Sequence, residues 1–345
     1  MKIASIGLSA PSVRLDNDQL ISLLRSKTDS LSPADCNRYF AFVKKLLLKS
    51  GARYRHVRDI DAGESAYTHI IDAAQDAINN AQISPSSIDL VIYCGVGRGV
   101  IEPANAYYYA NELGIRNAQC FDIADACMSW TRSLQLCEMY LELKKIKCAL
   151  VITGEFHLNL REPLKVESIK ALNYSFPAYT IGEAATATVL VQGSSPWNFV
   201  FASKPDLFDL CTIPLDGYTT YLRPNARIGL NGTGRFTSHG DELARFIGPM
   251  LFELAEKHGP NPENIDLYIP HSHSKSAYLD GFKKAGVPTD KVFLEVYENY
   301  GNIVSSGVPA GLHTAMAGGF AKRGSKICLI PASAGASCAC VSFTL

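Results

Sequence analysis

A cysteine at a predicted strand-to-helix junction is the first residue of this 345-residue chain that could do chemistry. Cys127 follows the strand-like residues 121–123, and apolar side chains recur at helical spacing from Trp130 to Leu141. The unpaired N–H groups and the macrodipole of a helix N-terminus favour a thiolate, the nucleophilic form of cysteine. Packing would explain Cys127 alone better than catalysis, so its partners must decide between the two interpretations.

Two further motifs supply a histidine and an asparagine for such a nucleophile. His271 and His273 follow a buried strand that ends near Ile269, at the strand end where open α/β sheets present functional groups. Asn302 lies in a Gly-Asn turn that opens a helix. A hydrogen-bonded loop would explain the histidines, and a helix N-cap would explain the asparagine. The three motifs together indicate one nucleophilic site.

The elements that must position these residues repeat along the chain. Apolar runs flanked by Gly or Pro alternate with amphipathic stretches, which is typical of an α/β protein with buried strands. Three pairs of stretches match in order: 85–92 with 262–269, 119–123 with 291–296, and 147–152 with 326–330. Chance similarity among strands and helices is the alternative to an internal duplication. The duplication predicts two packed halves, 1–193 and 194–345, with the site at their seam.

Composition and charge exclude several classes of function. The 33 basic and 33 acidic residues give a formal net charge of zero, without a basic stripe that would attract nucleic acid. No apolar run approaches the roughly 18 residues of a membrane-spanning helix, and the N-terminus predicts a first strand rather than a signal peptide. We therefore expect a cytoplasmic protein that contacts neither nucleic acid nor membrane. The ten cysteines are scattered without a CxxC pair, which predicts nine core thiols and no metal site.

The chain resembles the thiolase superfamily, and within it the enzymes of the β-ketoacyl-(acyl carrier protein) synthase III type. Three stretches look like that family's motifs: the Phe-Asp-Ile-Ala-Asp-Ala-Cys run ending at Cys127, the Pro-His pair at His271 and the Tyr-Gly-Asn run ending at Asn302. The resemblance implies a thiolase-like, five-layered αβαβα fold made of two duplicated halves. The chain departs from the family pattern at three places: Asp125, residues 272–274 and Glu183.

The resemblance also implies a role for each site residue. Cys127 would accept an acyl group from a thioester, which splits the reaction into acylation and condensation. The backbone N–H groups of Cys127 and Gly335 would form the oxyanion hole. His271 and Asn302 would donate hydrogen bonds to the enolate of the second thioester, with His273 as the alternative histidine. The predicted substrate-binding residues are Lys49, Arg53 and Ser274.

Glu102 stands where synthase III enzymes normally carry an apolar residue. That family inserts the surrounding segment, 99–105, across the dimer interface into the partner's acyl tunnel. Glu102 looks like the glutamate of head-to-head condensing ketosynthases, where an apolar tunnel raises the pKa of the carboxyl and suits it to remove a proton α to a thioester carbonyl. The alternative is a surface glutamate before the helix-starting Pro103.

The resulting prediction is a ketosynthase that joins acyl thioesters by Claisen condensation, in fatty-acid-derived or polyketide-like secondary metabolism. Its substrates would be acyl-CoA or acyl carrier protein thioesters, with no separate cofactor. We expect a homodimer, or a heterodimer with a related synthase. A carrier protein would dock on a basic patch composed of Lys44, Lys45, Lys49, Arg53 and Arg55. The alternatives are acyl transfer to a hydroxyl or amine, hydroxymethylglutaryl-CoA synthase-like chemistry, and a non-catalytic synthase partner.

Overall fold

Two five-stranded mixed sheets form the framework of the computed structural model, which describes residues 1–26, 28, 31–156, 168–271 and 273–345. The first sheet contains, in spatial order, β1 (Lys2–Ser9), β7 (Ala184–Val191), β6 (Cys148–Glu155), β4 (Leu90–Tyr93) and β5 (Gln119–Asp122). The second contains β11 (Leu267–Pro270), β12 (Lys326–Ile330), β14 (Ser337–Thr344) and β13 (Ala332–Ser333), with β8 (Asn198–Ser203) also paired to β14.

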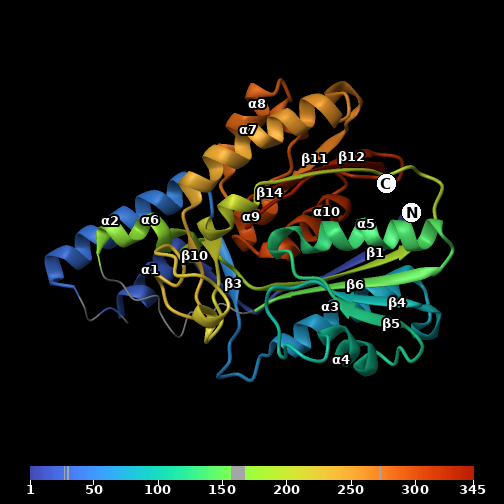
Figure 1. Cartoon of the computed structure of the whole chain (residues 1–345), viewed down its shortest axis with the longest axis horizontal. Helices are drawn as coiled ribbons and strands as arrows, with labels where there is room; N and C mark the ends of the chain where they lie inside the picture. Colours follow the sequence, from blue (N-terminus) through green and yellow to red (C-terminus); the bar gives the residue numbers. More distant parts are fainter. Residues whose placement is uncertain (27, 29–30, 157–167, 272) are drawn as a thin grey trace.

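Helices cover both faces of each sheet and produce five layers (Figure 1). The outer face of the first sheet packs against α3 (Ala66–Ala81) and α4 (Asn105–Glu112). Between the sheets lie α5 (Ser129–Glu142) and α10 (Gly307–Ala317), whose apolar residues share one core with strands of both sheets. The outer face of the second sheet packs against α7 (Gly240–His258) and α8 (Lys275–Lys284). The layer order is therefore αβαβα, as the resemblance predicts.

The alternation of side chains along each strand explains this layering. In β4, Leu90 and Ile92 belong to the core between the sheets, whereas Val91 and Tyr93 belong to the core under α3 and α4. The strand β12 divides its side chains between two cores in the same way. Strands that are buried on both faces need continuous apolar runs. These runs are the signal by which the sequence predicts the central strands.

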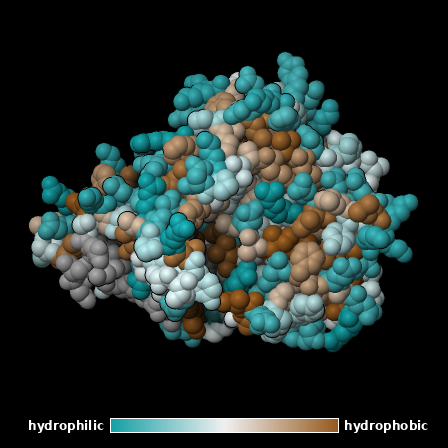
Figure 2. Space-filling view, in the orientation of Figure 1, coloured by the Kyte–Doolittle hydropathy of each residue, from teal (hydrophilic) through white to brown (hydrophobic). Residues whose placement is uncertain are grey.

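A smaller group of elements extends from one end of the layered body (Figure 1). It contains α1 (Asn17–Ser26), α2 (Pro33–Ser50) and α6 (Leu172–Ser175), which share a core of their own. Nearby are two short antiparallel pairs, β2 (Val13–Asp16) with β3 (Tyr54–Val57) and β9 (Cys211–Thr212) with β10 (Thr237–Ser238). Apolar patches interrupt the polar surface over the layered body (Figure 2). Within the described residues, no helix is long and apolar enough to cross a membrane.

The internal repeat extends to hydrogen bonds at matching positions. Asp89 precedes β4 and Asp266 precedes β11, each after one 3-10 turn. The carboxylate of Asp89 accepts a hydrogen bond from the N–H of Lys147 at 2.7 Å, and the carboxylate of Asp266 accepts one from the N–H of Lys326 at 2.8 Å. Each aspartate thus links the start of one strand to its parallel neighbour.

One matched stretch does not form the strand that the repeat predicts. The counterpart of β5 would be residues 291–296, but Val292 makes only an isolated bridge to Tyr268. The helix α9 (Glu295–Tyr300) begins directly afterwards, because Leu294 has already turned away from an extended conformation, with φ −126° and ψ 7°. The division into 1–193 and 194–345 remains a proposal, with one sheet on either side of the boundary.

Candidate active site

Cys127 lies at a sharp turn between β5 and α5, as the sequence predicts. It is the middle residue of a 3-10 turn, η2 (Ala126–Met128), in which Ala126 adopts a left-handed φ of 45°. The hydroxyl of Ser129 accepts a hydrogen bond from the N–H of Asp125 at 2.8 Å and donates one to the carbonyl of Ala126 at 2.7 Å. These two bonds hold a strained backbone conformation that places the thiol at the N-terminus of α5.

The thiol of Cys127 is protonated at rest. Burial raises its pKa well above the usual range, and the neighbouring Cys211 and Glu155 raise it further. A hydrogen bond with Ser333 and one with the N–H of Cys127 itself act in the opposite direction. Burial therefore outweighs the local N–H groups in setting the pKa of this thiol.

The carboxylate of Asp125 pairs with Arg132 instead of acting on the thiol. The Nε of Arg132 lies 3.0 Å from Oδ2 of Asp125, and the guanidinium also packs over the ring of Phe201 at 3.9 Å. The carbonyl of Asp125 accepts a hydrogen bond from the hydroxyl of Ser333 at 3.2 Å. Asp125 thus connects the turn of Cys127 to β13 in the second sheet.

Gly335, the predicted second donor of the oxyanion hole, lies in the hairpin between β13 and β14. Gly335 and Ala336 both adopt left-handed φ values, 75° and 47°. A Cβ at Gly335 would meet no described atom within 4 Å, so this position favours glycine for its conformation rather than for space. The hairpin begins at Ser333, which contacts the turn of Cys127, while the oxyanion role itself stays a prediction.

His271 follows β11 and is almost completely buried. Its side chain is 3% exposed, and Nδ1 has no hydrogen-bond partner among the described residues. Gly307, the first residue of α10, packs against the ring, since a Cβ there would lie 3.1 Å from Nδ1. Burial lowers the pKa of His271 to about 3, with a smaller contribution from His273. The imidazole is therefore neutral at physiological pH.

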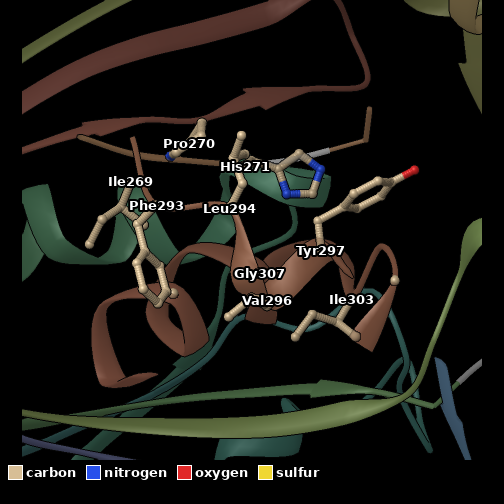
Figure 3. Close-up of a pocket in the computed structure, with 11 residues that line it drawn as sticks. Ile269, Pro270, His271, Phe293, Leu294, Val296, Tyr297, Ile303 and Gly307 are labelled. Atoms are coloured by element: carbon tan, nitrogen blue, oxygen red, sulfur yellow. The ribbon is translucent and has the colours of Figure 1, made fainter. Parts of the chain in front are cut away.

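A small pocket beside His271 has mainly apolar walls (Figure 3). Ile269, Phe293 and Ile303 are among the residues that line it, together with Tyr297. The hydroxyl of Tyr297 donates a hydrogen bond to the carbonyl of His273 at 2.7 Å, which holds the loop that carries His271. The adjoining Ser272 lies outside the described residues. The apolar walls explain why the charged form of the imidazole is disfavoured.

A close crossing of two chain segments positions the backbone of Asn302. Its N–H donates to the carbonyl of Thr180 at 2.8 Å, and its carbonyl accepts from the N–H of Gly182 at 3.1 Å. A Cβ on Gly182 would lie 2.1 Å from the carbonyl oxygen of Tyr300, and a Cβ on Gly301 would lie 2.3 Å from that of Thr180. Only glycine permits this approach at both positions.

The side chain of Asn302 is fixed by its own neighbours. Its Oδ1 accepts a hydrogen bond from the N–H of Val304 at 3.0 Å, as in a helix cap, so the amide NH₂ group remains as the donor for a ligand. The 3-10 turn that follows, η9 (Val304–Ser306), packs against the turn of Cys127. The segments that carry Cys127 and Asn302 are therefore in contact at the seam between the two sheets.

Sequence reasoning missed Glu155, a buried carboxylate beside this site. Its Oε1 accepts hydrogen bonds from the N–H of Ser305 at 3.2 Å and from the N–H of Val96 at 3.1 Å, and it also accepts one from the Ser305 hydroxyl. Glu155 therefore ties the turn after Asn302 to the loop after β4. A charged residue at the carboxyl end of the apolar strand β6 was the available signal.

Glu102 lies apart from this buried group, on an exposed loop between β4 and α4. Its neighbour Ile101 is 75% exposed, and Val100 is 45% exposed. Large exposed apolar side chains on one loop are typical of an interaction site. The predicted base role of Glu102 would therefore need a second subunit.

The predicted substrate-binding residues gather around the ends of α2 and α8. The carbonyl of Lys49 accepts a hydrogen bond from the hydroxyl of Ser276 at 3.1 Å. The side chain of Arg53 pairs with Glu298 at 2.8 Å, and the hydroxyl of Ser274 caps the first turn of α8. Lys49, Arg53 and Ser274 therefore lie on neighbouring elements at one edge of the site.

The prediction of a basic docking patch is wrong for one of its five residues, Arg55. Arg55 is completely buried, with its Nη1 donating to Oδ1 of Asn17 at 2.9 Å. Its Cβ lies close to both glycines of the crossing, at 3.2 Å from an added Cβ on Gly182 and 3.5 Å from one on Gly301. Arg55 is a core residue behind Asn302 and is not available to a carrier protein.

The remaining cysteines are less uniform than predicted. Six are buried: Cys94, Cys137, Cys148, Cys328, Cys338 and Cys340. Three are partly exposed, namely Cys36, Cys120 and Cys211, so they are not all core residues. Among the described residues, no cluster of His, Cys, Asp and Glu could hold a metal ion.

The chain is similar in sequence to known proteins of one family. Residues 255–345 match the family model for the C-terminal part of 3-oxoacyl-(acyl carrier protein) synthase III. A β-ketoacyl-(acyl carrier protein) synthase III of Clostridium perfringens is 25% identical over 341 residues, covering 95% of this chain and 94% of the relative. Its counterpart from Coxiella burnetii is 27% identical over 300 residues, covering 84% and 86%.

Solved structures of OleA from Xanthomonas campestris have the same fold. One OleA structure superimposes with a TM-score of 0.78 at 22% identity, covering 99% of this chain and 97% of that chain. A cysteine-to-serine OleA variant with bound lauric acid and lauroyl-CoA gives a TM-score of 0.80 at 21% identity, covering 99% and 98%. The chain therefore has a thiolase-like fold. The resemblance to β-ketoacyl-(acyl carrier protein) synthase III is confirmed along most of its length.

Replacing Gly301 by Ala tests the crossing that positions Asn302. The new Cβ would meet the carbonyl of Thr180 at 2.3 Å, so we expect the free energy of unfolding to fall by about 2–4 kcal/mol in urea titrations. Gly319→Ala is a matched control, because Gly319 has a similar φ of 74° but open space around it. Equal losses in both variants would show that conformation alone, and not the crossing, requires Gly301.

The protonated thiol predicts how alkylation of Cys127 depends on pH. Because the thiol pKa is raised, the thiolate fraction grows about tenfold per pH unit throughout the neutral range. We expect the rate of iodoacetamide labelling, followed by peptide mass spectrometry, to rise without a plateau from pH 6 to 9. A plateau near neutral pH would indicate a thiolate–imidazolium pair and contradict the neutral state of His271.

Proposed function

We propose that this protein is a ketosynthase that joins acyl thioesters by Claisen condensation through an acyl-Cys127 intermediate. One observation carries the proposal: the turn after Asn302 contacts the turn of Cys127, and Gly307, which follows it, packs against the buried imidazole of His271. Two neutral donors can stabilise an enolate, which a second carboxylate would destabilise. The relatives that bear the name β-ketoacyl-(acyl carrier protein) synthase III support this assignment.

Acylation needs no charged partner for the thiol. The sulfur of Cys127 attacks the thioester carbonyl, and the bond from that carbon to the leaving sulfur breaks. The proton of Cys127 passes to the departing sulfur of CoA or of the carrier protein, which leaves as a free thiol. The N–H groups of Cys127 and Gly335 are the proposed donors to the oxyanion that forms between these events.

Condensation would use the two donors on the other side of the seam. A base removes a proton from the carbon α to the carbonyl of a second thioester, and that carbon forms a bond to the carbonyl carbon of the acyl group on Cys127. The bond from this acyl carbon to the sulfur of Cys127 breaks, and the sulfur leaves as a thiolate that takes up a proton. The neutral His271 can donate one hydrogen bond to the enolate oxygen, and the NH₂ group of Asn302 can donate another. The presence of Asn302 favours condensation over acyl transfer to a hydroxyl or amine, because acyl transfer forms no enolate that would need this hydrogen-bond donor.

The proposed assembly is a dimer in which Glu102 enters the partner's acyl tunnel. Exposure of Val100 and Ile101 on the same loop supports this arrangement, since these apolar side chains would be buried there. A homodimer is the simplest case, and a heterodimer with a related synthase is the alternative. Such a base favours a specialised condensation in secondary metabolism, of the fatty-acid-derived or polyketide-like type.

The proposed entry for the thioester carrier lies at the edge formed by α2 and α8. Lys49 and Arg53 are exposed there and can contact the phosphates of CoA or of a carrier protein's phosphopantetheine. Lys45 is also exposed, whereas Lys44 pairs with Asp18 at 2.6 Å. Ser274 is the proposed contact for the pantetheine arm, at the start of α8.

Intact-mass spectrometry tests the acyl intermediate directly. Incubation with lauroyl-CoA should add one lauroyl group to the wild-type chain. The variant Cys127→Ala should show no adduct, because the nucleophilic sulfur is gone. Cys36→Ala is the matched control and should be acylated like the wild type, since Cys36 lies in the separate core of α1, α2 and α6. Acylation of the Cys127→Ala variant would contradict the proposed nucleophile.

A second experiment tests the base role of Glu102. We expect Glu102→Ala to lower the rate of condensation of two lauroyl groups by about 100-fold or more, the usual effect of a lost general base, while Cys127 acylation stays unchanged. Glu102→Asp keeps a carboxylate and should retain part of the activity. Gas chromatography of the products separates these outcomes. Unchanged product formation by Glu102→Ala would refute the base role.

A further inference from the structure

Tyr278 lies one turn beyond the loop that carries His271. The helix α8 begins after the cap residue Ser274, and the N–H of Tyr278 donates to the carbonyl of Ser274 at 3.2 Å. The ring of Tyr278 packs edge-on against the ring of His273, with centroids 5.3 Å apart and planes at 70°. The side chain is therefore directed from α8 toward the histidine loop rather than into solvent.

The hydroxyl of Tyr278 is buried without a partner. The residue is 8% exposed, and its hydroxyl makes no hydrogen bond within the described part of the chain. A buried hydroxyl that lacks a partner destabilises the fold, so native proteins normally satisfy or replace it. Phenylalanine would fill the same space without this cost. A ligand that supplies an acceptor would explain why the position carries tyrosine.

The surroundings of Tyr278 lead to the acylation site. Tyr278 belongs to the same buried cluster as Ala332 and Cys338, which pair with each other across the β13–β14 hairpin that carries Gly335. The next residue, Ser333, donates a hydrogen bond from its hydroxyl to the carbonyl of Asp125, two residues before Cys127. Burial raises the pKa of the Tyr278 hydroxyl above its usual range, and the neighbouring Cys127 raises it further. The hydroxyl is therefore protonated and can donate a hydrogen bond.

We propose that the Tyr278 hydroxyl is a substrate contact: it donates a hydrogen bond to an oxygen of the acyl thioester that reacts with Cys127. The inference rests on the proposed acyl-Cys127 chemistry. It adds a side-chain donor from α8 to the backbone donors proposed at Cys127 and Gly335. The acceptor is a carbonyl oxygen of the thioester or of its pantetheine arm, because these are the acceptors that every acyl thioester substrate brings.

The variant Tyr278→Phe tests this contact by removing only the hydroxyl. We expect the second-order rate constant of Cys127 acylation by lauroyl-CoA, followed by intact mass, to fall about tenfold, as for the loss of one hydrogen bond. The thermal midpoint should stay the same or rise, because an unsatisfied buried hydroxyl disappears. Tyr268→Phe is the matched control, since Tyr268 lies in the same core and packs against Phe282 instead.

The two measurements separate a substrate contact from a structural role. A slower acylation with unchanged or higher stability, and a control within twofold of the wild type, supports the proposal. Acylation of Tyr278→Phe at the wild-type rate overturns it. A lower thermal midpoint in step with the slower acylation also overturns it, because the hydroxyl then supports the fold. If the wild-type chain itself is not acylated, the proposed function fails. The wild-type measurement therefore distinguishes failure of the proposed function from failure of the Tyr278 contact.

Discussion

The close crossing of residues 180–182 and 300–302 is the constraint on which the site depends. It joins a loop that leads into the first sheet to a turn that leads into α10, and it sets the backbone of Asn302 by two hydrogen bonds. Two carbonyl oxygens approach Gly182 and Gly301 so closely that no side chain fits. The stem of Arg55 fills the space behind both glycines. Packing at the seam therefore determines where the amide donor stands.

Burial gives this site its electrostatic character. The same low-dielectric surroundings that raise the pKa of Cys127 lower the pKa of His271, so both groups are neutral when they meet a substrate. The charged residues nearby are held by other partners, Asp125 by Arg132 and Glu155 by backbone N–H groups. A neutral site suits a reaction whose charge appears only in its intermediates, because fixed donors then act where charge develops.

The sequence predicts the framework well and the electrostatics poorly. Strands buried on both faces have continuous apolar runs, and at Cys127 the spacing of apolar residues changes from that of a strand to that of a helix. Both features can therefore be predicted from a short stretch of sequence. The burial of Arg55 and the protonated state of Cys127 depend on which distant segments pack against them, and one sequence does not contain that information. Val292 shows the same limit. The sequence around it predicts a strand, but Val292 makes only an isolated bridge because the backbone leaves the extended conformation at Leu294. Glu155 was missed because its partners are 59 and 150 residues away.

In the proposed reaction, one thiol carries the acyl group while a separate pair of neutral donors serves the condensation. The decisive experiment is rapid-quench mass spectrometry of the Asn302→Ala variant supplied with lauroyl-CoA, which serves both as the acyl donor to Cys127 and as the second thioester. We expect acyl-Cys127 to form at the wild-type rate and to accumulate, with little condensed product. Condensed product at the wild-type rate would show that Asn302 does not serve the condensation. Loss of Cys127 acylation in a variant with an intact fold would show that the two sets of groups do not act separately.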